Sequence, residues 1–284
     1  MPAYESSERF STDRKLVNSW LSRALRFGKG IPKRLAEAMR YAVLGPGKRI
    51  RAVLALEAFR AARGEKEQWV VPFCCGIEMI HAFSLVHDDL PSMDDDDFRR
   101  GRPSLHRRFD VATAILGADA LFAYAFQLFA KSSAPCGRRI AAIELISRTV
   151  GPGGMAGGQM LDITANMHLS KPGLERLNRK KTADFLAAAL VTGAIIAGAR
   201  GETRDRLWRA GRILGSLFQT TDDLLDRDEE SDRNRMTTIN LYGPEGTRRR
   251  AVREARQAER LFHSFGPRYE ILAGFPQIVL ERTF

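Results

Sequence analysis

The hydrophobic positions of this chain follow helical spacing, recurring every three or four residues, and sustained alternation of apolar and polar residues is scarce. Two stretches, 112–130 and 185–199, are apolar on nearly every face, which is typical of helices at the centre of a large bundle. Proline and glycine mark several helix boundaries. The pattern predicts helices over residues 13–25, 32–44, 48–62, 66–89, 110–131, 137–164, 173–199, 204–227, 244–262 and 268–281.

An all-α fold follows from this pattern. The chain has 284 residues, which is large for one domain but enough for a stable core. No internal repeat, low-complexity linker or break in composition divides it. We therefore expect residues 1–284 to form a single domain, a large helical bundle.

The chain is strongly basic, with a net charge of +11 and a pI near 10.0. Such a charge suggests an anionic partner, which could be nucleic acid, a phosphorylated metabolite or a membrane surface, or else a surface of solvated arginines. Basic and aromatic residues are not interleaved in the way that a nucleic-acid-binding surface prefers. No nucleic-acid partner is therefore expected.

Cysteine usage and apolar length bear on the location of the protein. The three cysteines include no CxxC pair, so neither a zinc site nor a disulfide scaffold is suggested, and a reducing, cytoplasmic setting fits best. Charges run through the first thirty residues, without the apolar core of a signal peptide. The longest apolar stretch, 185–199, has fifteen residues, whereas a membrane span needs about 20, so no span is expected.

Two dense groups of aspartates each follow an apolar segment. HDDLPSMDDDDFRRGRPS at 87–104 holds six aspartates within ten positions, and FQTTDDLLDRDEE at 218–230 places Asp222 and Asp226 on one helix face. Carboxylates without histidine or cysteine suit hard cations, and Mg²⁺ binds one or two carboxylates and is completed by substrate phosphates. A single such motif is more often a solvated helix end, but two copies with adjacent arginines favour magnesium and a diphosphate.

Basic residues also form groups. They comprise Lys48, Arg49 and Arg51 after a glycine-rich turn, Arg99 and Arg100 after the first acidic group, and Lys181 with Thr182 before an apolar helix. Arginine binds phosphate oxygens through two parallel hydrogen bonds, while lysine acts as a point charge. These groups exceed the requirement of one diphosphate, whereas two diphosphates, one metal-bound and one metal-free, would use them all.

Together these residues resemble the trans-isoprenyl diphosphate synthases, the short-chain polyprenyl synthetase family. The resemblance runs from about residue 35 to 255, with the elements in family order: GKRIR at 47–51, IHAFSLVHDDLPSMDDDDFRRGRPSLH at 80–106, GGMAGGQMLDI at 153–163, KT at 181–182 and FQTTDDLLD at 218–226. It implies an all-α bundle of the isoprenoid synthase type around a central apolar cavity, usually a homodimer. The implied reaction is the head-to-tail condensation of isopentenyl diphosphate with an allylic diphosphate.

The resemblance also implies the site residues. Three Mg²⁺ ions on the allylic diphosphate would be held by two metal motifs: Asp88, Asp89 and Asp94, and Asp222, Asp223 and Asp226. Arg99 and Lys181, the latter followed by Thr182, would bind the same diphosphate, and Gln219 lies beside the second metal motif. The isopentenyl diphosphate pocket would comprise Lys48, Arg51, His81 and Arg100. His81 lies two turns before Asp88 on nearly the same face; a lone histidine there could also be a core residue.

The implied chemistry agrees with these residue types. Metals and cations would stabilise the negative charge on the departing diphosphate, for which Asp88, Asp94, Arg99, Lys181 and Asp222 are the expected catalytic set. The isopentenyl double bond would attack the resulting allylic cation, and the departing diphosphate is a plausible base for the released proton. The apolar helices would keep water from the cation.

Product length in this family depends on residues just before the first aspartate motif, here Phe83 and Ser84. An aromatic ring at Phe83 resembles enzymes that stop at farnesyl diphosphate, with dimethylallyl and geranyl diphosphates as primers, and geranylgeranyl diphosphate is the alternative. Phe83 could also be simple core packing, and Phe122 and Phe126 could share the task. The loop after Asp226 is shorter than is usual in the family.

Three other functions compete. A class I terpene cyclase shares the fold type and one aspartate motif, but it handles a single diphosphate and needs no GKRIR cluster. A non-catalytic subunit typically loses an aspartate motif, and this chain keeps both. A basic nucleic-acid-binding protein would explain the charge but not the paired acidic groups.

Overall fold

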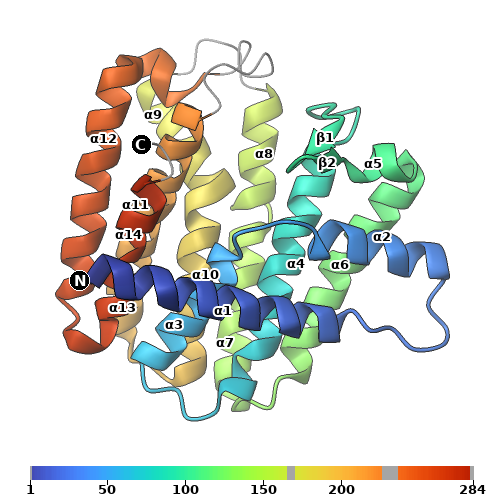
Figure 1. The fold of residues 1–284 in the computed structure, drawn as a ribbon, viewed down its shortest axis with the longest axis horizontal. Coiled ribbons are helices and arrows are strands. Elements are labelled where there is room, and N and C mark those ends of the chain that lie inside the picture. Colours follow the sequence, from blue (N-terminus) through green and yellow to red (C-terminus); the bar gives the residue numbers. More distant parts are fainter. Residues whose placement is uncertain (1, 165–169, 226–235, 282–284) are drawn as a thin grey trace.

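The computed structural model describes residues 2–164, 170–225 and 236–281, and it confirms the expected all-α fold (Figure 1). The longer helices within these ranges are α1 (Pro2–Ala24), α2 (Lys33–Leu44), α3 (Ile50–Ala61), α4 (Val71–Asp88), α6 (Val111–Lys131), α7 (Cys136–Val150), α8 (Met155–Thr164), α9 (Lys171–Asn178), α10 (Asp184–Ala197), α11 (Gly201–Leu225) and α12 (Thr238–His263). Short helices complete them: η1 (Glu67–Trp69), α5 (Leu105–Arg108), η2 (Arg179–Ala183), η4 (Pro267–Tyr269), α13 (Glu270–Ala273) and α14 (Phe275–Leu280).

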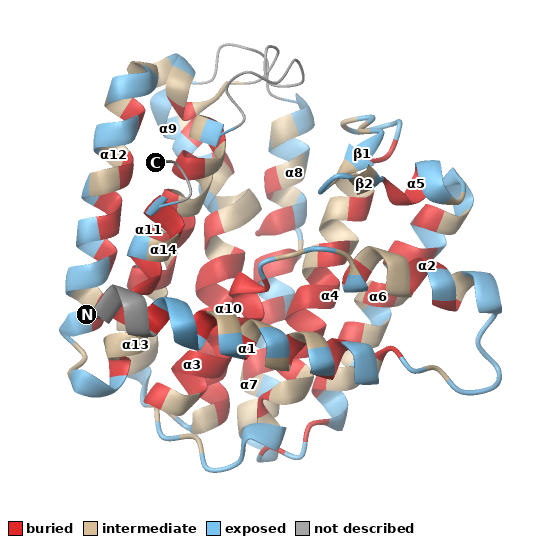
Figure 2. Cartoon of the chain, in the orientation of Figure 1, coloured by how far each residue is buried: buried red, intermediate tan, exposed pale blue. Residues whose placement is uncertain are grey.

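Helix α10 forms the centre of the bundle. Every residue from Phe185 to Ile196 is buried, as its uninterrupted apolar sequence predicts, and α10 packs against α3, α7 and α11 (Figure 2). Glycine permits the close approach of α10 to α11, because a Cβ at Gly211 of α11 would lie 2.7 Å from the Cα of Ala187 of α10. The core therefore depends on small residues as well as large apolar ones.

Helices α4 and α6 pack side by side and support the first acidic group. Two segments, Glu67–Asp88 and Val111–Lys131, are long and apolar enough to cross a membrane by length and composition alone. The first is mostly buried within the bundle, and the second is 28% buried in its most apolar window. Since core helices of globular proteins share this composition, these two segments are weak evidence for a membrane span.

The predicted helix over 137–164 is two helices, α7 and α8, separated at Gly151-Pro152-Gly153-Gly154. Proline lacks the amide hydrogen that would continue the ladder. At Gly154 the chain passes so close to α7 that a Cβ would lie 1.8 Å from the carbonyl oxygen of Thr149. Helix α8 begins after this break and runs towards the end of the bundle where the hairpin of β1 and β2 lies (Figure 1).

A short β-hairpin, with two residues in each strand and two in the turn, follows the first acidic group. The hydrophobic pattern did not predict it. Strand β1 (Phe98–Arg99) pairs antiparallel with β2 (Arg102–Pro103). The connecting residues Arg100 and Gly101 have φ angles of 54° and 72°, the positive values that a two-residue type I′ turn requires. Strands this short show no alternation of apolar and polar residues that a sequence pattern could reveal. The hairpin nevertheless positions Arg99 and Arg100, the two arginines of the first motif.

Candidate active site

The first acidic group lies at the C-terminal end of α4. Asp88 is the last helical residue, Asp89 caps the helix, and the amide of Asp94 donates to the carbonyl of Asp88 at 2.9 Å, which folds the loop back. The C-terminus of a helix carries partial negative charge and disfavours carboxylates. The chain therefore places several like charges where only cations can stabilise them.

The pKa of Asp88 shows that this arrangement destabilises its ionised form. Burial raises the pKa of Asp88 to about 6; Lys181 and Arg99 oppose the shift, and the neighbouring carboxylates of Asp94 and Asp89 add to it. Burial likewise raises the pKa of Asp89, against the lowering effect of Arg99. A carboxylate that ionises with difficulty in the metal-free protein is a suitable ligand for a cation, whose charge would offset the repulsion.

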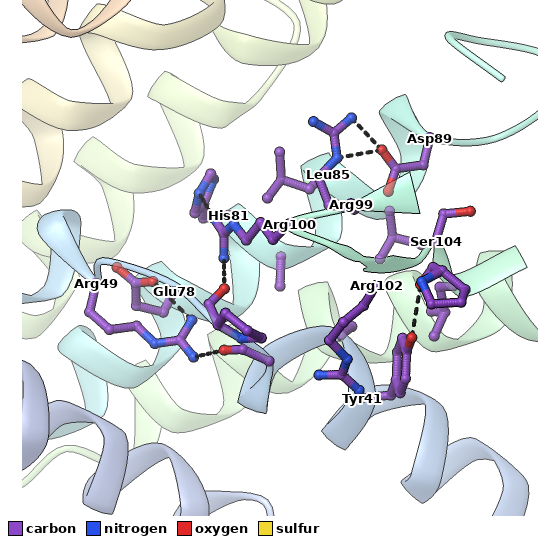
Figure 3. Close-up of a pocket in the computed structure, with 17 residues that line it drawn as sticks. Tyr41, Arg49, Glu78, His81, Leu85, Asp89, Arg99, Arg100, Arg102 and Ser104 are labelled. Carbon is purple, nitrogen blue, oxygen red and sulfur yellow. Dashed lines mark hydrogen bonds and ion pairs between the residues drawn. The ribbon is translucent and has the colours of Figure 1, made fainter. Parts of the chain in front are cut away.

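Arg99 holds the second aspartate of the motif. Its Nε and Nη2 donate to Oδ1 of Asp89 at 2.8 and 2.5 Å (Figure 3). Nη2 also donates to Oδ2 of Asp96 at 2.7 Å. Asp89 is 3% exposed, whereas the Arg99 side chain remains 36% exposed. The guanidinium therefore neutralises Asp89 while keeping surface available for an anion.

Arg100 and His81 form a second cationic group on the other side of the hairpin (Figure 3). Arg100 donates to the carbonyl of Pro46 at 2.9 Å, and its Nη2 lies 3.3 Å from Nε2 of His81. Burial and four surrounding arginines, Arg51 foremost, hold the pKa of His81 well below its usual value. The imidazole is thus neutral, with Nε2 accepting from Arg100 and the proton on Nδ1.

Arg51 completes this group from α3. It is 8% exposed, its guanidinium lies over the Phe185 ring at 5.6 Å, and its Nε has no hydrogen-bond partner among the described residues. Burial lowers the pKa of Arg51, and Glu78 and Asp222 oppose that shift. A buried guanidinium with an unused donor is prepared for an anionic ligand. Lys48 is exposed at the start of the same segment.

Arg49, between these two cations, has a structural role. Its φ of 55° places it in the left-handed region, and its guanidinium donates to Asn18 and to the carbonyls of Val43 and Gly45. These bonds fix the turn that precedes α3. A cavity of about 60 Å³ between α2, α4 and the hairpin is lined by Arg49, Arg99, Arg100 and Arg102 (Figure 3). Glu78 and Asp89 also line this cavity, so its four guanidinium groups leave an excess of positive charge over the carboxylates.

The second acidic group ends α11. Asp223 is 7% exposed and accepts three hydrogen bonds, from Gln219 at 3.0 Å and from the amide and hydroxyl of Thr238 at 2.7 and 2.6 Å. Gln219 in turn accepts from the Thr182 hydroxyl at 3.1 Å. Asp222 is half-buried and acts electrostatically on Arg51, so α11 faces the cationic group of α3. Asp226 lies outside the described residues.

Lys181 occupies a π-helical turn, η2, which joins α9 to α10. Such turns are frequent at functional sites, and no local sequence signal predicts this one. Lys181 Nζ pairs with Asp162 of α8 at 2.5 Å and also acts on Asp88. The close approach of α8 to η2 depends on Gly158, where a Cβ would lie 2.6 Å from the backbone nitrogen of Lys181.

Two residues of α8 were missed as site candidates. Asp162 pairs with Lys181, and Gln159, although half-buried, has no partner for its amide oxygen or nitrogen among the described residues. The signal was present, because both belong to the GGMAGGQMLDI segment that supports the family resemblance. An unpartnered amide beside a lysine and aspartates can bind a polar ligand or water.

The donor set fits a hard cation that is completed by its ligand. Within the described part of the chain, no group of three or more His, Cys, Asp or Glu side chains is close enough to hold a metal ion by itself. Asp88 and Asp94 nevertheless supply oxygen donors whose mutual repulsion a cation would relieve, and Asp222, near the end of α11, acts electrostatically on Arg51. This is the pattern of Mg²⁺, which takes few carboxylates and is completed by phosphates.

The residues expected to set chain length lie below the acidic group on α4. The Phe83 ring contacts the rings of His87 and Phe122, with centroid separations of 4.5 and 4.8 Å. Ser84 donates to the carbonyl of His81 at 3.0 Å, within the helix. Of these two side chains, Phe83 is the bulkier and packs against α6, whereas Ser84 bonds within its own helix.

Comparison with known proteins identifies the family. Residues 32–236 match the polyprenyl synthetase family. The chain is 42% identical over 206 residues to geranylgeranyl pyrophosphate synthase 7, chloroplastic, of Arabidopsis thaliana, a match covering 71% of this chain and 59% of that protein. It is 41% identical over 226 residues to the farnesyl diphosphate synthase of Geobacillus stearothermophilus, covering 78% and 75%.

A solved structure agrees over nearly the whole chain. The crystal structure of an FPP/GFPP synthase from Zymomonas mobilis superimposes with a TM-score of 0.90 at 31% identity, covering 98% of this chain and 99% of that one. The order of the motifs, the neighbouring acidic and basic groups and these similarities all indicate the same family. The chain belongs to the polyprenyl synthetase family.

Proposed function

We propose that this protein is a magnesium-dependent trans-prenyltransferase that condenses isopentenyl diphosphate head-to-tail with dimethylallyl or geranyl diphosphate. The proposed product is farnesyl diphosphate, with geranylgeranyl diphosphate as the alternative. One observation carries the proposal: Arg99 and Lys181 lie beside the carboxylates, while Arg51, Arg100 and neutral His81 form a separate group that could bind an anion. Two distinct cationic groups at one end of an apolar bundle suit two diphosphates.

The metal-bound diphosphate belongs on the carboxylate side. Asp88, Asp94 and Asp222 would hold Mg²⁺, with Asp226 expected to join them, and three ions are expected by resemblance. When bound, the metal would neutralise charge on the leaving diphosphate. Arg99 and Lys181 would then release their intramolecular pairs, with Asp89 and Asp162, to bind phosphate oxygens.

The metal-free diphosphate belongs on Arg51, Arg100 and His81, with Lys48 at the entrance. Arg51 offers its unused Nε, and His81 can donate through Nδ1 while Nε2 accepts from Arg100. This arrangement would orient the isopentenyl double bond towards the allylic carbon. The buried apolar residues of α4 and α10 would exclude water from the cation.

The relatives support both products, since their names include farnesyl and geranylgeranyl diphosphate synthases. A terpene cyclase remains the less favoured candidate, because it has no use for a second, metal-free diphosphate site.

We also propose that the protein forms a homodimer through the outer face of α6. Four large apolar side chains are exposed on α6 and the adjacent α7: Leu116 and Ile140 at 62% each, Val111 at 43% and Ile115 at 38%. A helix of this length with a largely unburied apolar face is stabilised when a second copy covers it.

We also propose a cytoplasmic location, because all three cysteines are free thiols, which suits a reducing compartment.

The test is product formation from isopentenyl diphosphate with dimethylallyl, geranyl or farnesyl diphosphate, with and without Mg²⁺, analysed by mass spectrometry. We expect magnesium-dependent elongation of the shorter primers. Failure to elongate every primer by a folded, magnesium-loaded protein would contradict the proposal. Cyclised hydrocarbons from a single diphosphate would instead identify a cyclase.

A further inference from the structure

The hairpin that carries Arg99 and Arg100 borders the cavity between α2 and α4. Tyr41 of α2, and Arg102 and Pro103 of β2, line the same cavity (Figure 3). Close packing holds side chains in place elsewhere in the bundle, but it cannot do so across an open space. On this side, the position of the hairpin therefore depends on the individual contacts that tie it to the helices.

Tyr41, near the end of α2, supplies two of these contacts. Its hydroxyl donates to the carbonyl of Pro103 at 2.8 Å, and the guanidinium carbon of Arg102 lies over its ring, 4.0 Å from the centroid (Figure 3). The Phe109 ring meets the Tyr41 ring edge-on, with centroids 6.0 Å apart, and limits its rotation. One side chain of α2 thus contacts both residues of β2.

Strand pairing connects β2 to the arginines of the site. Arg102 faces Arg99 in the antiparallel register, and Pro103 faces Phe98. Arg100 follows Arg99 directly, in the turn between the strands. Because each strand has only two residues, a displacement of β2 would move both arginines with it.

An aromatic partner for Arg102 suits the charge of this segment. The hairpin holds three arginines within four residues, and like charges that face each other across two strands are destabilising. Arg99 is paired with Asp89 and Asp96, whereas Arg102 has no carboxylate partner among the described residues. The π face of Tyr41 stabilises the guanidinium without cancelling its positive charge. The hairpin therefore keeps its attraction for anions.

We propose that Tyr41 is a positioning residue for both diphosphate subsites. It holds the hairpin, and with it Arg99 and Arg100, in place against α2 and α4. Its effect on the reaction passes through the hairpin, so it is not a catalytic residue. This inference rests on the prenyltransferase activity proposed above, which assigns the two arginines to the two substrates.

The experiment compares the kinetics of the wild type, Tyr41→Phe and Tyr41→Leu with isopentenyl and geranyl diphosphates and Mg²⁺. Tyr124→Phe and Tyr124→Leu are the matched controls, because the Tyr124 hydroxyl also donates to a backbone carbonyl at 2.8 Å, that of Ala24, and joins α6 to α1. Calorimetric titration with inorganic diphosphate, without Mg²⁺, measures anion binding independently of turnover. Thermal unfolding reports the folded fraction.

We expect Tyr41→Leu to raise the KM of both substrates, and the Kd for inorganic diphosphate, by at least about tenfold, because a misplacement of about 1 Å can cost about 10²-fold. Tyr41→Phe keeps the ring and loses one hydrogen bond, so the same constants should rise by about twofold to fivefold. The Tyr124 variants should keep wild-type values. A side chain that only stabilised the fold would lower the folded fraction, and hence kcat, at unchanged KM.

Unchanged KM and Kd values in a folded Tyr41→Leu variant would overturn the inference, and so would equal rises in the Tyr124 variants. If Tyr41→Leu does not fold, Tyr41→Phe decides, and wild-type constants in that variant would overturn the inference. Failure of the underlying function would look different: the wild type would form no elongated product, while the diphosphate titration would still report the effect of Tyr41 on anion binding.

Discussion

Asp222 and Asp223 are adjacent in sequence, but the Asp223 carboxylate is already engaged by three donors from Gln219 and Thr238. Both were expected to bind metal, and these contacts suggest that Asp223 positions α11 against the start of α12. We predict that Asp223→Asn lowers the free energy of unfolding by about 1–3 kcal/mol, the cost of leaving buried donors poorly matched. Asp222→Asn is the control, expected to weaken Mg²⁺ binding with little loss of stability.

Chemical denaturation and Mg²⁺ titration by calorimetry, in the presence of inorganic diphosphate, would measure both quantities. An Asp223→Asn variant of wild-type stability that no longer binds Mg²⁺ would show that Asp223 is a direct ligand.

The raised pKa of Asp88 predicts a pH dependence. The carboxyl group stays protonated up to about pH 6 in the folded protein but ionises near pH 3.9 when unfolded. The metal-free protein should therefore lose stability as pH rises through this interval. Mg²⁺ binding requires the carboxylate, so its affinity should fall by up to about tenfold per pH unit below 6.

Calorimetric titration of Mg²⁺ with diphosphate across this range would measure the slope, and Asp88→Asn should reduce it. An affinity that does not vary below pH 6 in the wild type would contradict the assignment.

At the scale of elements, α1 is attached to α3 by a buried ion network. Arg60 donates to Asp13 at 2.8 Å, to Glu57 at 2.6 Å and to Glu67 at 2.5 Å, and the first two carboxylates are 2% and 6% exposed. Arg60→Ala would leave the two buried carboxylates of Asp13 and Glu57 with only Arg9, a 42% exposed side chain whose Nε lies 3.4 and 3.3 Å from them. We predict a loss of about 3–5 kcal/mol of unfolding free energy.

The control is Arg34→Ala, which removes an exposed pair with Asp110 and should cost at most about 1 kcal/mol. Guanidinium-induced unfolding compares the two variants. Equal losses would mean that the Arg60 network adds no more than a surface ion pair.

The sequence could predict most elements but not all of their interruptions. Apolar periodicity places α2, α3 and α6 within a few residues, because a buried face repeats over many turns, whereas the single helix predicted over 173–199 is divided into α9, η2 and α10. The hairpin and the π turn at Lys181 are too short to produce a period, and they are stabilised by tertiary contacts. The motifs indicate the candidate site residues, but only the structure separates Arg49, which holds a turn, from Arg51, which has an unused donor.

At the scale of the whole molecule, the exposed face of α6 predicts self-association. We expect sedimentation to show a dimer, and Leu116→Asp to weaken the dimer at least about tenfold, because a desolvated unpaired charge costs several kcal/mol. Ile31→Asp, at an exposed apolar residue outside this face, is the matched control. A wild type that remains monomeric at high concentration would contradict the proposal.

The hairpin turn has a consequence for how two substrates are kept apart. Arg99 and Arg100 are joined by one peptide bond, yet one contacts Asp89 and the other His81 and the Pro46 carbonyl. The proposed separation of the two diphosphate subsites thus depends on the register of a single dipeptide. Inserting one residue between these arginines would add no charge and remove none, but it would misalign both subsites at once.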